Sequence, residues 1–194
     1  MSIIFHNIPT EMKREMNTIH ITFEPLQDSH FPLLLRWLEA PHVKAWWDQD
    51  VHWNLELIKE KFGDCAKGYK LEKGVQKPIQ AYVIYGDDHP LGYIQLYNAY
   101  DFSREDQIPL EGLPASLAAI DIFIGEEEYV GKGLGSLIMR QFLKEYVDPS
   151  YDACFVDPDT ANVQAIRACE KAGFEKVKTV KEGTVTWMVR TKGA

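Results

Sequence analysis

A single acidic residue interrupts an apolar run near the middle of the chain, and a glycine-rich segment follows it. Asp121 is the only charged residue in the run 117–124, and the segment Gly-Lys-Gly-Leu-Gly occupies residues 131–135. From residue 134 onward the apolar positions have the spacing of an amphipathic helix. A strand, a glycine loop and a helix in this order are typical of an anion site, because the first helical turn offers unpaired N–H groups and the positive end of its dipole. We therefore predict that this loop binds a pyrophosphate.

The glycine loop differs from two common phosphate motifs. It lacks the Gly-Lys-Ser/Thr triplet of nucleoside-triphosphate loops, and the order Gly131, Gly133, Gly135 is not the Gly-x-Gly-x-x-Gly of dinucleotide-binding folds. Glycines after a strand also form ordinary turns, and an ordinary turn is the alternative interpretation here. A pyrophosphate site built from main-chain amides is the hypothesis that the rest of the chain must support.

Asp121 is a candidate functional residue because of where it lies. A carboxylate inside a core strand costs several kcal/mol unless it is paired or faces a cleft. A structural salt bridge or a hydrogen bond to the main chain is one explanation. We favour a functional role, because the strand leads directly into the glycine loop.

Length and charge limit the classes of function. With 194 residues and a formal net charge of −8, the chain fits one α/β domain and has no excess of basic residues for a nucleic-acid surface. A cationic small molecule suits this charge better, although many proteins are acidic for solubility alone. We expect no nucleic-acid partner.

Cysteine content and the N-terminal residues bear on the compartment. Cys65, Cys154 and Cys169 are too few and too scattered for a disulfide framework or a zinc site, which favours a reducing cytosol. No run approaches the roughly 20 apolar residues of a membrane span, so we expect no membrane association. Residues 1–18 are predicted to be a leader and residues 19–194 a single domain. We expect a cytoplasmic protein, either a monomer or a homodimer.

Hydrophobic periodicity and turn residues predict seven strands and four helices. Asp28 or Ser29 is expected to cap the first helix, and Pro41 to end it. The predicted strands span 19–24, 79–85, 91–97, 117–124, 153–156, 174–180 and 184–189, and the predicted helices 28–38, 55–62, 133–147 and 160–171.

Two connecting segments carry acids beside aromatic residues. Trp47 and Asp48 lie between the first two helices, and they are either core anchors or a place where a cationic ligand stacks and pairs. The loop 98–117 contains four acids and one arginine, and it is either a substrate lid or simply solvated. Its charged residues are Asp101, Arg104, Glu105, Asp106 and Glu111.

The segment 162–174 resembles the closing motif of the GNAT superfamily of acetyl-CoA-dependent N-acetyltransferases, which reads N-x-x-A-x-x-x-Y-x-K-x-G-F. Asn162, Ala165, Lys171 and the pair Gly173-Phe174 match it, and the glycine loop lies about 30 residues earlier. Over residues 19–192 the chain is most similar to aminoglycoside 6'-N-acetyltransferases. The resemblance implies an α/β (α+β) GNAT fold, with a central mixed, mostly antiparallel sheet of about seven strands and helices on both faces.

The resemblance also implies roles for individual residues. Asp121 would accept the proton of the substrate amine, and the residues that bind other parts of the substrate would be Trp47, Asp48, Tyr97, Asp101 and Asp157. Main-chain amides of 130–136 would bind the pyrophosphate of acetyl-CoA, and 122–124 would align its pantetheine arm. The full set on the coenzyme side is Ile122, Phe123, Ile124, Val130, Gly131, Lys132, Gly133, Leu134, Gly135, Ser136, Asn162 and Ile166.

Two positions depart from the family pattern. Val130 stands where the superfamily often has Gln or Arg, so more of the pyrophosphate contact must come from loop amides. Cys169 stands where the usual Tyr is taken to protonate the departing coenzyme. The coenzyme thiol has a pKa not far from that of cysteine, ~8.5, so its thiolate leaves tolerably well without a donor, and we expect Cys169 to pack in the core.

Direct transfer needs no covalent enzyme intermediate. Asp121 would accept a proton from an ammonium group, and a main-chain N–H near Phe123 would stabilise the developing negative charge. The favoured acceptor is a polycationic amine, most simply the 6'-amine of an aminoglycoside. The alternatives are a siderophore hydroxylamine or a polyamine as acceptor, or a noncatalytic sensor that binds acyl-CoA.

Overall fold

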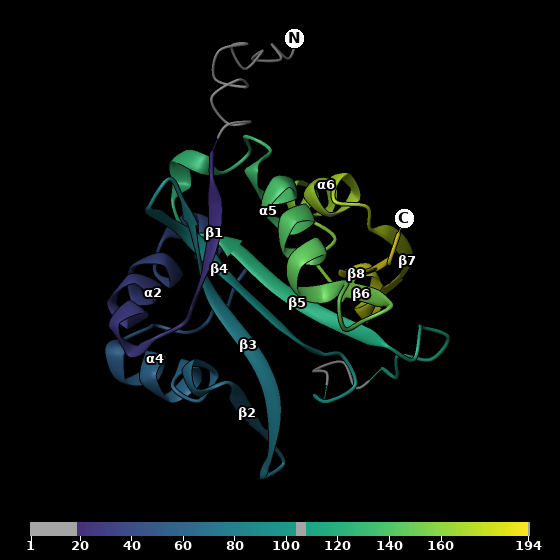
Figure 1. The fold of residues 1–194 in the computed structure, drawn as a ribbon, viewed down its shortest axis with the longest axis horizontal. Coiled ribbons are helices and arrows are strands. Elements are labelled where there is room, and N and C mark those ends of the chain that lie inside the picture. The colour runs from purple at the N-terminus through teal and green to yellow at the C-terminus, as the bar shows by residue number, and fades with distance from the viewer. Residues whose placement is uncertain (1–18, 104–107, 194) are drawn as a thin grey trace, which may run out of the picture.

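The computed structural model describes residues 19–103 and 108–193, which form one mixed sheet with helices on both faces (Figure 1). The predicted leader 1–18, and Arg104, Glu105 and Asp106 of the acidic loop, lie outside the described residues. The strands are β1 (Ile21–Pro25), β2 (Tyr69–Glu72), β3 (Val75–Gly86), β4 (His89–Asn98), β5 (Leu117–Ile124), β6 (Ala153–Val156), β7 (Glu175–Val180) and β8 (Val185–Thr191). The helices are α2 (Phe31–Leu38), α3 (Pro41–Lys44), α4 (Leu55–Phe62), α5 (Leu134–Phe142) and α6 (Val163–Lys171).

The sheet order is β1-β3-β4-β5-β6-β8-β7, and β2 pairs with the N-terminal end of β3. All pairs are antiparallel except β5 with β6. The predicted fold class is therefore confirmed, with one strand more than the seven expected. Strand β2 was missed because its apolar and polar residues alternate over only four positions, Tyr-Lys-Leu-Glu, which is the shortest pattern that indicates a strand.

Alternation along β5 distributes its side chains between two layers. Ala118 and Ile120 pack with α5 residues such as Leu134, whereas Leu117 and Ala119 belong to a separate cluster on the opposite face. Helices α5 and α6 cover the first face, and α2 and α4 cover part of the second (Figure 1). Because successive strand residues alternate, Asp121 shares the face of Leu117 and Ala119. That face is the one turned away from α5.

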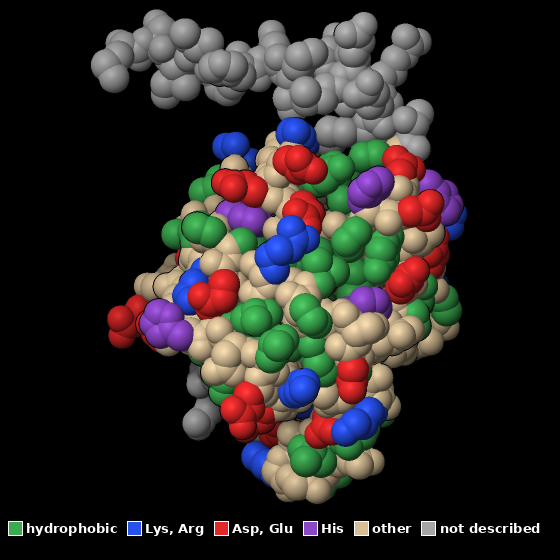
Figure 2. Space-filling model, turned by 90° about the vertical axis from the view of Figure 1, so that its left-hand side faces the viewer, with side chains coloured by type: hydrophobic (Ala, Val, Ile, Leu, Met, Phe, Trp, Pro, Cys, Tyr) green, Lys and Arg blue, Asp and Glu red, His purple; other side chains and the backbone are tan. Residues whose placement is uncertain are grey.

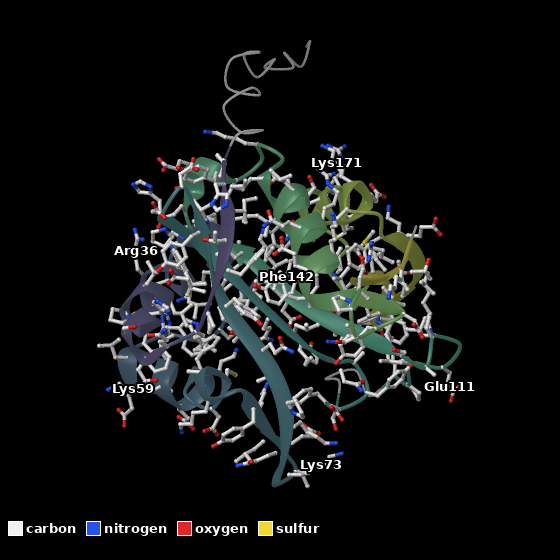
Figure 3. The ribbon with its side chains drawn as sticks, in the orientation of Figure 1. Arg36, Lys59, Lys73, Glu111, Phe142 and Lys171 are labelled. Carbon is white, nitrogen blue, oxygen red and sulfur yellow. The ribbon has the colours of Figure 1, made fainter. Side chains whose placement is uncertain are left out.

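The last residue of α5, Phe142, belongs to a group of aromatic side chains within a largely aliphatic core. Phe142 lies near the middle of the molecule, between α5 and the sheet (Figure 3). Its ring packs against Phe23 of β1 and Tyr82 of β3, with centroid distances of 5.0 and 5.7 Å. This packing fixes α5, and with it the glycine loop that precedes the helix, on the sheet.

Strands β5 and β6 pair only briefly and then separate. Their register runs from Leu117 opposite Ala153 to Ala119 opposite Phe155, whereas β4 stays paired with β5 up to Ile124. The edge of β5 beyond residue 120 therefore has no strand partner on the β6 side within the described part of the chain. An open strand edge can pair with an extended ligand that carries amide groups.

Several predicted element boundaries need correction. Neither Asp28 nor Ser29 caps α2, because both lie in a short 3-10 turn that leads into the helix. Pro41 begins α3, where its fixed φ and missing N–H fit the first helical position. Helix α6 begins at Val163 and not at residue 160, since the Asn162 side chain accepts a hydrogen bond from the Ala165 amide and caps the helix there.

Strand β3 begins at Val75, four residues before its predicted start at residue 79, and other boundaries agree more closely. Strands 117–124 and 153–156 and helix 55–62 have the predicted bounds, and the residues after α5 continue as a π-helical turn to Val147. Strand β1 includes Pro25, which is tolerated because β1 is an edge strand.

The surface over α2 and α4 mixes both signs of charge. Acidic and basic side chains alternate with apolar ones on the face that Figure 2 shows, and no basic stripe crosses the described residues drawn there. Among the described helices, none is both long and apolar enough to cross a lipid bilayer.

Gly92 allows β4 to lie close to β5, and replacing it should destabilise the fold. A Cβ at residue 92 would overlap the Phe123 carbonyl oxygen. The atoms in contact belong to the main chain of β5, which cannot move aside as a flexible side chain could. We expect Gly92→Ala to cost about 3 kcal/mol or more and to lower Tm by roughly 6–12 °C. Thermal unfolding followed by circular dichroism measures this, and a Tm within about 2 °C of the parent would contradict it.

Candidate active site

Asp121 lies at the wall of a cavity and accepts hydrogen bonds from the neighbouring strand. It stands opposite Gln95 of β4, whose Nε2 donates to Asp121 Oδ2 at 2.6 Å. The Tyr97 hydroxyl also donates to this carboxylate. The cavity has a volume of about 190 Å³ and lies on the sheet face away from α5. Its lining residues are Tyr97, Ala99, Phe102, Ser103, Ala119, Asp121, Phe155, Asp157, Lys181 and Val185.

The surroundings of Asp121 raise its pKa above the ordinary carboxyl value. Burial is the largest cause, and the nearby charge of Asp157 adds to it. Hydrogen bonds from Gln95 and Tyr97, together with the positive charge of Lys70, act in the opposite direction and are smaller. A carboxylate with a raised pKa is a better proton acceptor near neutral pH than a solvated one.

This raised pKa should make the charged side chain a cost to stability. The folded protein holds the proton more tightly than the unfolded chain, so stability falls as pH rises from about 3.9 through the folded pKa. Asp121→Asn removes the cost and keeps an oxygen for Gln95. Above the folded pKa we expect the Tm of this variant to exceed that of the parent by about 2–4 °C per kcal/mol gained. Calorimetry from about pH 3 to 8 checks this, and equal Tm values at both ends would refute it.

Two other predicted substrate residues share the cavity with Asp121. Tyr97 comes from β4, and Asp157 follows the end of β6. The two acids therefore come from neighbouring parallel strands and face one hollow. A site with two acids and aromatic walls suits a molecule with more than one ammonium group.

Three other predicted substrate residues contact described parts of the protein. Asp101 pairs with Lys77 Nζ at 2.9 Å, and Asp48 pairs with Lys61 Nζ at 2.5 Å. Trp47 packs edge-on against Phe123 with ring centroids 5.1 Å apart, as the core interpretation expected. In the acidic loop, Glu111 points away from the molecule (Figure 3).

The glycine loop has the backbone geometry of an anion cradle. Gly131 and Gly133 have φ of 76° and 88°, in the left-handed region that favours glycine, and Gly133 immediately precedes α5. Both are exposed. Within the described residues, the N–H groups of 131–136 donate to no main-chain carbonyl. The loop therefore leaves several amides without a main-chain partner at the positive end of the helix.

The side chains around this loop contribute less than its main chain. The Val130 amide donates to the Glu127 carbonyl at 3.0 Å, so the open amides begin one residue later. Leu134 and Ser136 are buried, and the Ser136 hydroxyl donates to the Gly133 carbonyl at 2.8 Å. Lys132 and Gly135 are partly exposed.

Two predicted coenzyme residues belong to helix α6. The Asn162 side-chain oxygen caps the helix through the Ala165 amide at 3.1 Å. Ile166 is 7% exposed and packs in the core between α5 and α6. In this structure the Asn162 side chain caps a helix and the Ile166 side chain packs in the core.

The predicted pantetheine residues of β5 do not all direct their main-chain N–H and C=O groups to the same side of the strand. The Leu117 carbonyl accepts a hydrogen bond from the Ala99 amide, and the Gly125 amide donates to the Leu91 carbonyl, so both residues bond on the β4 side. Since N–H and C=O directions alternate, the amide of Phe123 also faces β4, whereas Ile122 and Ile124 face the open edge. The expected N–H donor near Phe123 must therefore come from a neighbouring residue.

One carbonyl on the open edge already has a partner. The Ile124 carbonyl lies 3.1 Å from His42 Nε2 of α3. This contact ties the short α3 helix to the end of β5. It leaves the main-chain groups of Ile122 as the nearest ones available to a ligand.

Cys169 is buried in the core, as expected of a packing residue. It is 5% exposed, and burial raises the pKa of its thiol to about 12. At neutral pH the thiol is therefore protonated and not nucleophilic. All three cysteines are free and buried.

The residues that sequence reasoning missed include three that line the cavity with a ring or a charge and one that holds Asp121. Phe102, Phe155 and Lys181 line the cavity, and Gln95 holds Asp121. Only Gln95 left a usable signal, because it is a polar residue in period-two spacing with Tyr93 and Tyr97 in an otherwise apolar strand. The other three are brought together by long-range packing that local patterns do not encode.

Comparison with known proteins relates this chain to acetyltransferases. A family model described as an acetyltransferase (GNAT) domain matches residues 27–182. The aminoglycoside N(6')-acetyltransferase type 1 of Klebsiella pneumoniae is 28% identical over 177 residues, which cover 90% of this chain and 84% of that protein. A kanamycin resistance protein of Rhizobium radiobacter is 37% identical over 78 residues, or 39% of this chain and 72% of that protein.

Solved structures agree with this relationship. AAC(6')-Ib in complex with parmomycin and acetyl-CoA has a TM-score of 0.73 and 26% identity, over 89% of this chain and 93% of that one. The same enzyme with coenzyme A and kanamycin gives a TM-score of 0.73 and 26% identity, over 89% and 95%. The match of the family model across most of the sequence shows that the chain belongs to the GNAT acetyltransferases.

Proposed function

We propose that this enzyme transfers the acetyl group of acetyl-CoA to a primary amine of a polycationic small molecule, most simply the 6'-amine of an aminoglycoside. The observation that carries the proposal is the position of Asp121, which faces a cavity shared with Asp157 on the strand that leads to the amide-lined loop. The relatives named for aminoglycoside acetylation, and their complexes with acetyl-CoA and kanamycin, support the choice of both substrates.

The coenzyme side of the proposal uses mainly main-chain groups. The amides of 131–136 would hold the diphosphate, and Ile122 would pair with the pantetheine arm along the open edge of β5. Ile124 would contribute its amide, because its carbonyl already contacts His42. Lys132, at the loop, would add a positive charge. Asn162, Ile166, Phe123 and Val130 would then serve mainly to position these groups.

Asp121 would act on the amine, not on the thioester. An ammonium group passes a proton to the carboxylate, and the neutral nitrogen then forms a bond to the acetyl carbon as the carbon–sulfur bond breaks. The sulfur leaves as a thiolate, and the second proton that the acylated nitrogen loses neutralises this thiolate, so the products are the amide and coenzyme A thiol. The raised pKa of Asp121 helps the first step, because a base works best when its pKa approaches the working pH.

The cavity offers groups for the rest of a polycation. Asp157 would pair with a second ammonium group, and the rings of Tyr97, Phe102 and Phe155 would contact sugar-like faces. Asp48 and Asp101 would join only by exchanging Lys61 and Lys77 for a substrate amine. Trp47 would support the site from the core through Phe123.

A steady-state screen tests this function. Acetyl-CoA is mixed with kanamycin-like aminoglycosides, polyamines and hydroxylamines, and the released thiol is measured. We expect the highest kcat/KM with the aminoglycosides, and NMR of the product should show acetylation at the 6'-amine. Higher kcat/KM with polyamines or hydroxylamines would reassign the acceptor. Tight acetyl-CoA binding without turnover on any amine would indicate a noncatalytic sensor.

A further inference from the structure

A chain of two hydrogen bonds leads from the protein core to Asp121. The Tyr93 hydroxyl donates to Gln95 Oε1 at 2.7 Å, and Gln95 Nε2 donates to Asp121 Oδ2 at 2.6 Å. Tyr93 and Gln95 are two residues apart on β4, so their side chains lie on one face. These hydrogen bonds therefore reach the Asp121 carboxylate along the sheet face, from the β4 side. They leave the cavity side of Asp121 to a substrate.

Tyr93 is the donor at the start of this chain. It is fully buried, and its ring packs against Phe123 and Phe62 with centroids 5.5 Å away in each case. Burial raises its pKa well above the ordinary value, so the hydroxyl keeps its proton. A buried hydroxyl needs an acceptor, and Gln95 Oε1 provides one.

The donor role of Tyr93 fixes the orientation of the Gln95 carboxamide. If the amide turned over, its NH₂ would face the Tyr93 hydroxyl and its oxygen would face the carboxylate of Asp121. The first contact would leave the Tyr93 proton without the acceptor that Gln95 Oε1 now provides, and the second would place two acceptors together. Tyr93 thus forces the NH₂ of Gln95 toward Asp121.

We propose that Gln95, locked by Tyr93, is a positioning residue that holds Asp121 in its ionised, proton-accepting form. The proposal rests on the function assigned above to Asp121. A hydrogen bond from an amide N–H to a carboxylate favours the charged form and fixes one oxygen. Burial and Asp157 act against ionisation, so without this donor more of the enzyme would carry a protonated Asp121 that cannot accept a proton.

Other groups also face Asp121, and they would remain in a Gln95 variant. Tyr97 of β4 donates to the carboxylate, and Asp157 and Lys70 act on it through their charges. Lys181, from the turn after β7, lines the same cavity. Removing the Gln95 amide should therefore shift the proton equilibrium of Asp121 without abolishing the base.

The chain offers a matched control on the adjacent strand. The Tyr82 hydroxyl donates to Gln80 Oε1 at 2.8 Å, with the same residue types and spacing on β3. Gln80 is exposed and lies outside the cavity. Gln95→Met and Tyr93→Phe can thus be compared with Gln80→Met and Tyr82→Phe, which remove an equivalent pair.

The test is the pH dependence of kcat/KM for acetyl transfer. For Gln95→Met we expect the acidic limb of the profile to move to higher pH. On that limb kcat/KM should fall by about tenfold or more, and it should partly recover at higher pH. Tyr93→Phe should move it in the same direction by less, because Gln95 keeps its NH₂ but loses its lock. Both control variants should retain the parent profile, and KM for acetyl-CoA should stay within about twofold in all four.

A second readout does not depend on turnover. Carboxyl carbon NMR of Asp121 in the free protein should give a higher titration midpoint in Gln95→Met than in the parent. An unchanged midpoint and an unchanged pH profile would overturn the role of Gln95 even if the parent acetylates amines. Failure of the parent to acetylate any amine would instead overturn the proposed function, and the NMR result would still decide whether Gln95 controls the ionisation of Asp121. If Gln95→Met does not fold, Tyr93→Phe, which keeps the ring packing, decides the question.

Discussion

Asp121→Asn is expected to lower kcat for acetyl transfer by about 10²–10⁴-fold, the range typical of a lost general base. Asparagine has the shape of aspartate, and its side-chain oxygen can still accept from Gln95 Nε2. It cannot take a proton from an ammonium group. The loss should appear in kcat and should be partly relieved at high pH, where more of the amine is already neutral. Steady-state rates of thiol release between about pH 6 and 10 measure it.

The control for this variant must separate chemistry from binding and folding. Acetyl-CoA affinity, measured by calorimetric titration, should stay within about twofold, because the amides of 131–136 do not touch Asp121. Asp159→Asn is a suitable companion, since Asp159 is exposed and its side chain accepts a local hydrogen bond from the Ala161 amide. A kcat for Asp121→Asn within a few-fold of the parent would remove Asp121 from the role of base.

The sequence predicts best where local composition and local structure agree. Strand β5 is a strongly apolar run that ends at glycine, and its predicted bounds, 117–124, are confirmed. Asp121 could be singled out because a charge in such a strand needs a reason, and the structure places it at a cavity. The positive φ of Gly131 and Gly133 likewise follows from a turn that other residues rarely form.

Interactions between distant segments could not be read from the sequence. The acidic loop predicts an Asp101 that binds substrate, but β3 brings Lys77 Nζ to within 2.9 Å of its carboxylate. Gln95 became part of the site only through the register of β4 with β5, and a shift of one residue would have turned it to the other face. Such pairings depend on the whole sheet and not on any local pattern.

Helix α6 shows a competition between local signals. A periodic pattern suggested a start at residue 160, yet the helix begins at Val163. The reason is that the Asn162 side chain accepts from the Ala165 amide, and an asparagine cap favours a start directly after it. The cap rule would have given the correct boundary if it had been weighed above the apolar spacing.

Gly133→Ala is expected to weaken acetyl-CoA binding by about tenfold or more, because two or more amide contacts to the diphosphate would be disturbed. Gly133 has a φ of 88°, and a Cβ added there meets no atom within 4 Å, so the methyl group would project into open space. In the proposed complex that space lies beside the diphosphate. The left-handed conformation also costs an alanine about 1–2 kcal/mol, so the loop itself would tend to move. Calorimetric titration with acetyl-CoA and with coenzyme A measures the effect.

Gly74 provides the control that makes this prediction specific. It lies in the turn between β2 and β3, has a φ of 80°, and likewise shows no atom within 4 Å of an added Cβ. Gly74→Ala therefore carries the same backbone strain and a similar loss of Tm, but it is remote from the loop before α5. We expect its affinity for acetyl-CoA to equal that of the parent. If both variants bound the coenzyme as tightly as the parent, the amides preceding α5 would not form the diphosphate site, and the placement of the thioester beside Asp121 would have to be abandoned.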